Sequence, residues 1–143
     1  MRLISPYELE YELRSIEVHS MIVPFPTKLI DNLPAPIRVI TTPEGAAKLN
    51  GNTEVRILEC LHAKLAIGKK GAIFGSWNFS KSNYQYTDSP SRHIEGVLKI
   101  DDCDPIFHDL EKFFENWWVM ARKPIEQMGE NKPTPKLTIS TFC

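Results

Sequence analysis

The stretch from Leu61 to Phe79 places the strongest constraint on how this chain can fold. Two runs rich in apolar and β-branched residues, Leu61 to Ile67 and Ala72 to Phe79, flank the tetrapeptide Gly68-Lys69-Lys70-Gly71. Short strand-forming runs separated by a glycine-containing turn predict a β-hairpin. A hairpin near the middle of the sequence commits the chain to a sheet with antiparallel pairing.

The residues before this hairpin alternate between strand-like and helix-like segments. Glu17 to Phe25 and Ile37 to Thr41 are expected strands, and short helices are expected at Thr27 to Leu33 and from Thr42 to Asn50. This alternation is typical of α/β proteins in which some strands pair in parallel. Together with the hairpin it predicts an α/β fold, a mixed β-sheet flanked by helices.

Further elements complete the expected domain. Strands are expected at Thr53 to Leu58 and Ile94 to Ile100, and a helix begins near Ser5. Another helix follows Asp104-Pro105, with hydrophobic residues on one face: Ile106, Leu110, Phe113, Phe114, Trp117 and Ala121. Prolines and a lack of helical period mark the end of the chain. We therefore expect one domain at residues 1–122 and an extended C-terminal tail at residues 123–143.

Composition narrows the class of protein. The net charge is −1 over 143 residues, so nucleic acid would have to be bound by a local basic patch rather than by bulk charge. Glu8, Glu10 and Glu12 stand where a signal peptide needs an apolar core. No apolar run approaches the roughly 20 residues of a membrane span. Three widely spaced cysteines predict free thiols in a reducing compartment. We expect a cytoplasmic protein with no membrane partner.

His62 and Lys64 are polar residues within the first strand of the hairpin. Because side chains alternate along a strand, these two share one face, whereas Leu61, Ala63 and Leu65 share the other. Burying an imidazole and an ammonium costs both groups their hydration, so a purely structural core would not select them. This pair therefore indicates a functional site.

Polar residues on the neighbouring strands extend the same site. Ser76 and Asn78 lie at the end of the second hairpin strand and share a face, close to the height of His62 and Lys64. Glu95 is the only carboxylate within the strand that follows. We expect these side chains to converge on one region. No cluster of carboxylates or cysteines suggests a metal, so no metal and no cofactor is expected.

The segments His62-Ala63-Lys64 and Gly75-Ser76-Trp77-Asn78 resemble the His-x-Lys and Gly-Ser-x-Asn motifs of the phospholipase D superfamily. The resemblance is strongest over residues 61–80 and is only topological for residues 1–59. It implies a phospholipase D-like fold and a metal-independent phosphodiesterase. One position departs from the family pattern, since Lys69 stands where the family usually has an aspartate.

The resemblance also implies a role for each residue. His62 would attack phosphorus and form a phosphohistidine, while Lys64 and Asn78 would donate hydrogen bonds to the nonbridging oxygens. Glu95 would fix the tautomer of the imidazole, and Ser76 would orient its neighbours. The chemistry needs a second histidine as general acid and base, yet the motif occurs once. A two-fold homodimer would supply it.

The loop from Ser80 to Arg92 suggests the substrate. Lys81, Tyr84 and Arg92 combine cations with an aromatic ring, as phosphate contacts and base stacking require. The preferred function is a nuclease acting on DNA or RNA, which is also what the resemblance implies for a short single-motif member. Two alternatives stay open: a phospholipid-hydrolysing enzyme, and an inactive nucleic-acid-binding module of the same fold, which Lys69 would favour.

Overall fold

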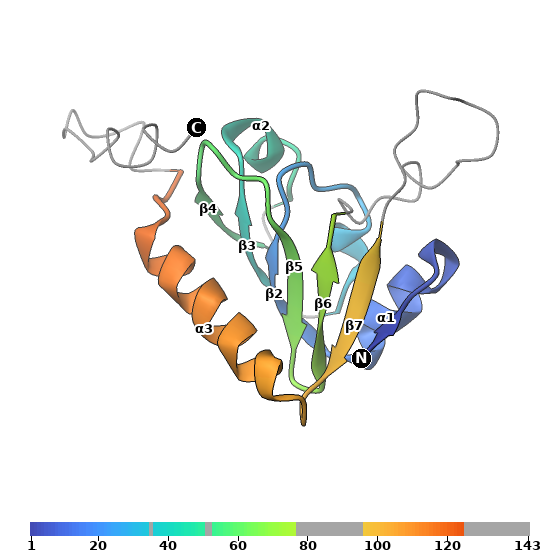
Figure 1. Ribbon diagram of the computed structural model, residues 1–143. Helices are drawn as coiled ribbons and strands as arrows, with labels where there is room; N and C mark the ends of the chain where they lie inside the picture. The colour runs from blue at the N-terminus through green and yellow to red at the C-terminus, as the bar shows by residue number, and fades with distance from the viewer. Residues whose placement is uncertain (35, 51–52, 77–95, 125–143) are drawn as a thin grey trace.

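A computed structural model describes residues 1–34, 36–50, 53–76 and 96–124 of the chain. Within these residues seven strands form one sheet in the order β1-β7-β6-β5-β2-β3-β4 (Figure 1). The strands are β1 (Arg2–Leu3), β2 (Val18–Ile22), β3 (Arg38–Thr41), β4 (Glu54–Ile57), β5 (Lys64–Gly68), β6 (Gly71–Gly75) and β7 (Val97–Asp101). β2, β3 and β4 pair in parallel, and the remaining pairs are antiparallel. The expected mixed α/β sheet is confirmed.

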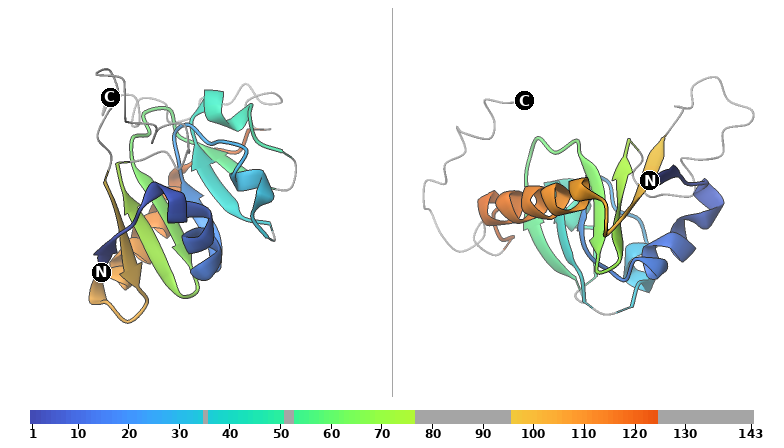
Figure 2. Two further views of the ribbon diagram at one scale, coloured as in Figure 1. Left: turned by 90° about the vertical axis from the view of Figure 1, so that its right-hand side faces the viewer. Right: turned by 60° about the horizontal axis from the view of Figure 1, so that its bottom comes forward.

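The helices cover both faces of this sheet. They are η1 (Pro6–Glu8), α1 (Leu9–Ser15), η2 (Ile30–Asn32), α2 (Pro43–Ala46) and α3 (Pro105–Met120). α3 crosses one face, while α1 and η2 cover the other (Figures 1 and 2). No α-helix forms at Thr27 to Leu33, where a short helix was expected. Consecutive i→i+3 hydrogen bonds run from the Thr27 carbonyl to the Leu33 N–H, and the 3₁₀ helix η2 lies within this stretch.

Two hydrophobic clusters hold these layers together. Leu9, Leu13 and Ile16 of the α1 segment pack with Ala66 and Ile73 on one face. On the other face, residues of α3 pack against the strands, and the members include Ile40, Leu65, Ile67, Ala72, Phe107, Leu110, Phe114 and Trp118. β5 contributes to both clusters, so it lies in the centre of the core.

The buried face of α3 differs from the one predicted. Phe107 and Trp118 are buried, whereas Ile106, Phe113 and Trp117, placed on the apolar face from their spacing, are 36–44% exposed. The buried face of α3 is thus rotated about the helix axis relative to the predicted one, and two arginines of the sheet account for this difference. The guanidinium carbon of Arg56 lies 4.3 Å and that of Arg38 5.2 Å from the Trp118 ring centroid, and such stacking stabilises the buried indole. Arg56 also donates to the Trp118 carbonyl at 2.6 Å.

The cysteine prediction is wrong at one position. Cys103 is a free and exposed thiol, but Cys60 is disulfide-bonded. The argument for a reducing compartment assumed that all three cysteines were free, so it no longer holds. Of the helices in the described part, none has the length and apolar character to cross a bilayer. Residues 125–143, most of the expected tail, lie outside the described residues.

Candidate functional site

His62 and Lys64 lie at the end of the sheet where β5 begins. His62 belongs to the segment that joins β4 to β5, and Lys64 is the first residue of β5. Leu65 belongs to the cluster under α3, and Leu61 and Ala63 pack against the same cluster. The strand expected from Leu61 to Ile67 therefore begins only at Lys64, and His62 precedes it. The apolar contacts attach this segment to the core, and His62 and Lys64 lie between the apolar residues.

The two polar side chains contact each other. The Lys64 Nζ lies 3.4 Å from the Nδ1 of His62. An ammonium group can only donate, so Nδ1 is the acceptor and the proton of the neutral ring lies on Nε2. The imidazole of His62 is exposed, whereas Lys64 is 8% exposed.

Lys64 is therefore a buried cation. Removing an ammonium from water is costly unless an opposite charge compensates it. Among residues 1–34, 36–50, 53–76 and 96–124, no carboxylate forms an ion pair with Lys64. Within this part of the chain, a buried positive charge thus lies beside an exposed ring nitrogen, an arrangement that can hold an anion next to a nucleophile.

Ser76 connects the ends of two strands. Its backbone N–H donates to the Gly96 carbonyl at 3.0 Å, and its Oγ accepts from the Gly96 N–H at 3.1 Å. Gly75 pairs with Lys64 across β5 and β6, and a Cβ at Gly75 would collide with the Gly96 carbonyl oxygen. The glycine and the serine of this motif therefore allow β6 and β7 to approach closely beside Lys64.

Several predicted site residues lie outside the described residues. They are Asn78, Lys81, Tyr84, Arg92 and Glu95. Of the predicted residues that are described, the structure brings His62 and Lys64 together and places Ser76 at the neighbouring strand end.

Lys69, which replaces the aspartate of the family pattern, lies in the turn between β5 and β6. Its backbone N–H is 3.4 Å from the Glu17 carbonyl, and the neighbouring Lys70 pairs with the Glu17 carboxylate at 3.0 Å. This turn is at the opposite end of β5 from Lys64 (Figure 1). The position at which the sequence departs from the motifs that it resembles therefore lies in the hairpin turn, away from His62.

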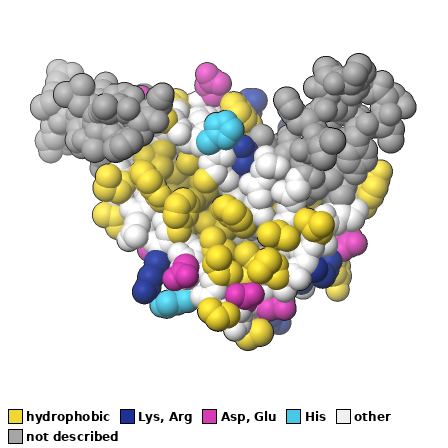
Figure 3. Space-filling model, viewed as in Figure 1, with side chains coloured by type: hydrophobic (Ala, Val, Ile, Leu, Met, Phe, Trp, Pro, Cys, Tyr) yellow, Lys and Arg dark blue, Asp and Glu magenta, His cyan; other side chains and the backbone are white. Residues whose placement is uncertain are grey.

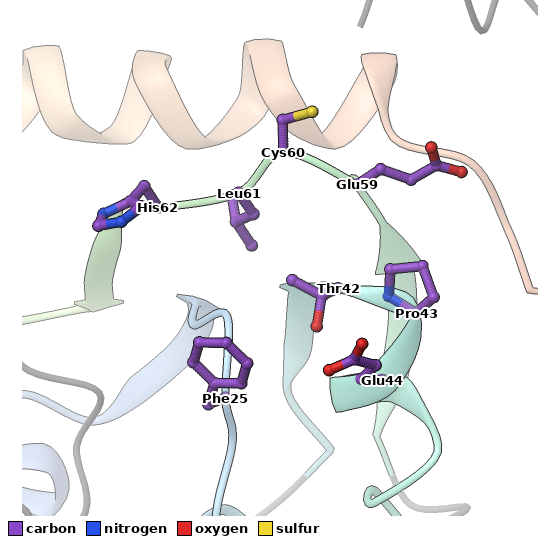
Figure 4. Close-up of a pocket in the computed structure, with 8 residues that line it drawn as sticks. All are labelled: Phe25, Thr42, Pro43, Glu44, Glu59, Cys60, Leu61 and His62. Atoms are coloured by element: carbon purple, nitrogen blue, oxygen red, sulfur yellow. The ribbon is translucent and has the colours of Figure 1, made fainter. Parts of the chain in front are cut away.

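A pocket of about 650 Å³ extends from His62 over the ends of the parallel strands. Phe25, Thr42 and Glu59 line it, and they follow β2, β3 and β4 respectively. Figure 4 shows the pocket between the segment that leads to His62 and the beginning of α2. Sequence reasoning missed these residues, although ligands of α/β sheets commonly bind at the carboxyl ends of parallel strands.

The described part of the chain holds no group of three or more His, Cys, Asp and Glu side chains that could bind a metal ion. Among the described residues, the groups near this site include the imidazole of His62, the ammonium of Lys64 and the carboxylates that line the pocket.

Solved structures with a similar fold include the following two. NucT from Helicobacter pylori superposes with a TM-score of 0.57 at 18% identity, over 85% of this chain and 97% of that one. TrmBL2, an archaeal chromatin protein whose structure shows a novel mode of DNA binding, superposes with a TM-score of 0.53 at 12% identity, over 85% of this chain and 53% of that one. This chain thus spans about half of TrmBL2. At these identities the likeness establishes the fold.

No protein-family model matches the chain. No curated protein matches it either.

Proposed function

We propose that this protein is a phosphodiesterase of the phospholipase D type that cleaves nucleic acid. The observation that carries the proposal is the buried Lys64 ammonium 3.4 Å from the ring of the exposed His62. A phosphodiester group is a monoanion that needs both a cation at its nonbridging oxygens and a nucleophile at phosphorus. These two side chains supply both within one short segment.

His62 acts as the nucleophile in two steps. Its Nε2 lone pair attacks phosphorus, the bond to the leaving strand breaks, and the departing oxygen takes a proton from a second histidine. The second histidine, now neutral, removes a proton from water, and the water oxygen releases phosphate from His62. The covalent intermediate divides one slow displacement into two faster ones.

Substrate binding prepares this nucleophile. In the free protein Lys64 donates to Nδ1 of His62, which keeps the ring proton on Nε2. A phosphoryl oxygen attracts the ammonium away, Nδ1 can then carry the proton, and Nε2 presents its lone pair. We assign Glu95 to accept from Nδ1, Asn78 to donate to the second phosphoryl oxygen, and Ser76 to position both through the strand ends.

The second histidine comes from a second copy of the chain. An apolar surface that supports such a dimer lies on the face covered by α3, where Figure 3 shows a broad area of hydrophobic side chains. Exposed apolar side chains of α3 include Ile106, Phe113, Trp117 and Met120, and Phe74 is exposed on β6. A broad exposed apolar area is typical of a protein interface. A two-fold arrangement would bring together two copies of His62.

Nucleic acid is the preferred substrate for two reasons. TrmBL2, which shares the fold, is described by its mode of DNA binding. Lys81, Tyr84 and Arg92 in addition provide cations and a ring for phosphates and bases. The proposed catalytic domain comprises residues 1–122. Whether the substrate is DNA or RNA is decided by the cleavage assay described next.

The test is cleavage of labelled DNA and RNA, single-stranded and duplex, in excess EDTA. The wild-type protein should cut at least one of them, and His62→Ala should lower the rate by a factor of about 10³ or more. His108→Ala is the matched control, because that histidine is exposed on α3 with a side-chain exposure of 70%. Denaturation during turnover should yield an acid-labile phosphoprotein.

Three results would contradict the proposal. Binding without cleavage would indicate a module that has lost catalysis. Cleavage of phospholipid vesicles alone would indicate a lipase. Equal rates for wild type and His62→Ala would exclude this histidine as the nucleophile.

A further inference from the structure

The pocket beside His62 has two different walls. The segment before β5 forms one wall, and its Leu61 side chain points toward the pocket, whereas Cys60 points away (Figure 4). Phe25 and Glu44 form the other wall and face this segment. A substrate held by His62 therefore has an aromatic ring and a carboxylate within its surroundings.

Phe25 is exposed on a segment that the fold holds firmly. The ring is 51% exposed, while the preceding Pro24 carbonyl accepts hydrogen bonds from Thr41 Oγ1 at 3.3 Å and Thr42 Oγ1 at 2.9 Å. A Cβ at Gly45 of α2 would collide with Thr41 and with Pro24, so α2 packs closely against this segment. A fixed and exposed aromatic ring at the edge of a pocket is suited to stacking on a planar group.

The polar groups of the pocket are not equally available. The Thr42 hydroxyl accepts from the Gly45 N–H at 3.0 Å and donates to Pro24, so the fold already uses it. Glu59 pairs with Arg122 at 2.6 Å. Glu44 is exposed and its carboxylate extends toward Phe25 (Figure 4). The residues that line the described pocket include neither Lys nor Arg, so the pocket favours N–H donors over phosphate.

We propose that this pocket binds an unpaired nucleobase next to the scissile phosphate, and that it prefers guanine. The inference rests on the proposed function, since His62 and Lys64 hold the phosphate. Phe25 stacks on the base. The two oxygens of Glu44 accept the ring N–H and the exocyclic amino group of guanine, a pair of donors that matches a carboxylate.

The same chemistry rejects other substrates. Thymine and uracil offer one ring N–H, and the carbonyl oxygen on each side of it is repelled by the second carboxylate oxygen of Glu44. Cytosine and adenine offer a single amino group. Guanine in a duplex uses these donors for its own base pair. The proposal therefore identifies the substrate as a single strand that is cut beside guanine.

Binding and cleavage test the proposal separately. Fluorescent single-stranded nonamers differ only at the central position, which is guanine, thymine or an abasic linker. Anisotropy at low salt with His62→Ala measures binding without turnover, and product mapping with the wild-type protein measures cleavage. We expect guanine to bind about tenfold more tightly than thymine and to mark the main cleavage position.

Two pairs of variants identify the side chains responsible. Phe25→Ala should reduce binding of the guanine strand to the level of the abasic strand, whereas Tyr7→Ala, at an exposed ring on η1, should not. Glu44→Gln should abolish the difference between guanine and thymine, because an amide offers one acceptor and one donor. Glu54→Gln, at an exposed carboxylate on β4, should preserve it.

The outcomes distinguish this inference from the proposed function. Equal binding and equal cleavage for guanine, thymine and abasic strands would overturn the base pocket and leave the phosphodiesterase intact. A lack of cleavage with every substrate would overturn the proposed function. Binding that depends on guanine and on Phe25 would support the pocket even then.

Discussion

Glu12 of α1 and Lys64 of β5 are both buried and ionisable, but their surroundings differ. Glu12 is 2% exposed, and its carboxylate pairs with Arg2 and with Lys99, each at 2.6 Å. Lys64 is 8% exposed and, within the described residues, contacts the ring of His62 while no carboxylate pairs with it. Burial alone therefore does not identify a functional charge. Glu12, which has ion-pair partners, holds a strand and a helix together. Lys64, which has no such partner among the described residues, is suited to binding a ligand.

Among the variants that test this comparison, Lys64→Met should give the largest effect, a loss of the cleavage rate. The rate of phosphodiester cleavage should fall by a factor of about 10² to 10³, because a group that stabilises the transition-state charge is lost. The free energy of unfolding should stay the same or rise, since methionine replaces a buried ammonium by an apolar group of similar length. Enzyme kinetics and thermal unfolding measure the two quantities.

Lys99→Met is the matched control for this variant. It removes a lysine that pairs with Glu12, so it should lower stability and preserve the catalytic rate. If Lys64→Met unfolds the protein more readily than Lys99→Met does, then Lys64 has a structural role and the contrast between the two regions is wrong.

Glu12→Gln tests the other side of the comparison. It leaves Lys99, 17% exposed, without its opposite charge, and it removes the carboxylate that raises the pKa of Arg2 above its ordinary value. We expect a loss of about 3 kcal/mol in the free energy of unfolding, measured with urea.

Glu8→Gln provides the control, because Glu8 is 48% exposed and pairs with Arg2 at 3.4 Å. Exposed pairs of this kind contribute less than about 1 kcal/mol. An equal loss for the two variants would show that burial of Glu12 adds nothing to its ion pairs.

Local sequence patterns predicted much of the sheet for a clear physical reason. The hairpin of β5 and β6 joins residues that are close in the sequence, and Gly68 and Gly71 bound its turn. The position of His62 was predicted less well, because β5 begins at Lys64 and His62 lies before the strand on which it was expected. The hairpin was therefore accessible without knowledge of the tertiary structure, whereas the exact start of β5 was not.

Other features depend on contacts between distant parts of the chain. β1 is two residues long and exists because it pairs with β7, about a hundred residues later. The exposed face of α3 depends on Arg38 and Arg56 of the sheet. The pocket combines ends of three separate strands. A search for polar and aromatic residues in the short segment after each parallel strand would have found Phe25 after β2 and Glu44 after β3.

His19 gives the smallest expected effect and separates a structural histidine from His62. It lies half-buried on β2, with Nδ1 2.9 Å from the Ser20 Oγ. Burial lowers its pKa below the ordinary value of 6.5, and the nearby Arg38 lowers it further, against the opposing effect of the carboxylates on α3. The folded state thus binds fewer protons than the unfolded state when the pH falls below this value.

The free energy of unfolding should therefore decrease as the pH is lowered from 7 through about 6.5 toward 5. His19→Gln should reduce this dependence, because glutamine keeps a polar side chain that does not titrate, and it should leave the cleavage rate near that of the wild type. His108→Gln, at an exposed position, should leave the wild-type dependence in place. Urea unfolding at several pH values measures the effect. A steeper loss of stability in acid for His19→Gln would reverse the sign, and it would mean that the fold stabilises the charged ring at position 19.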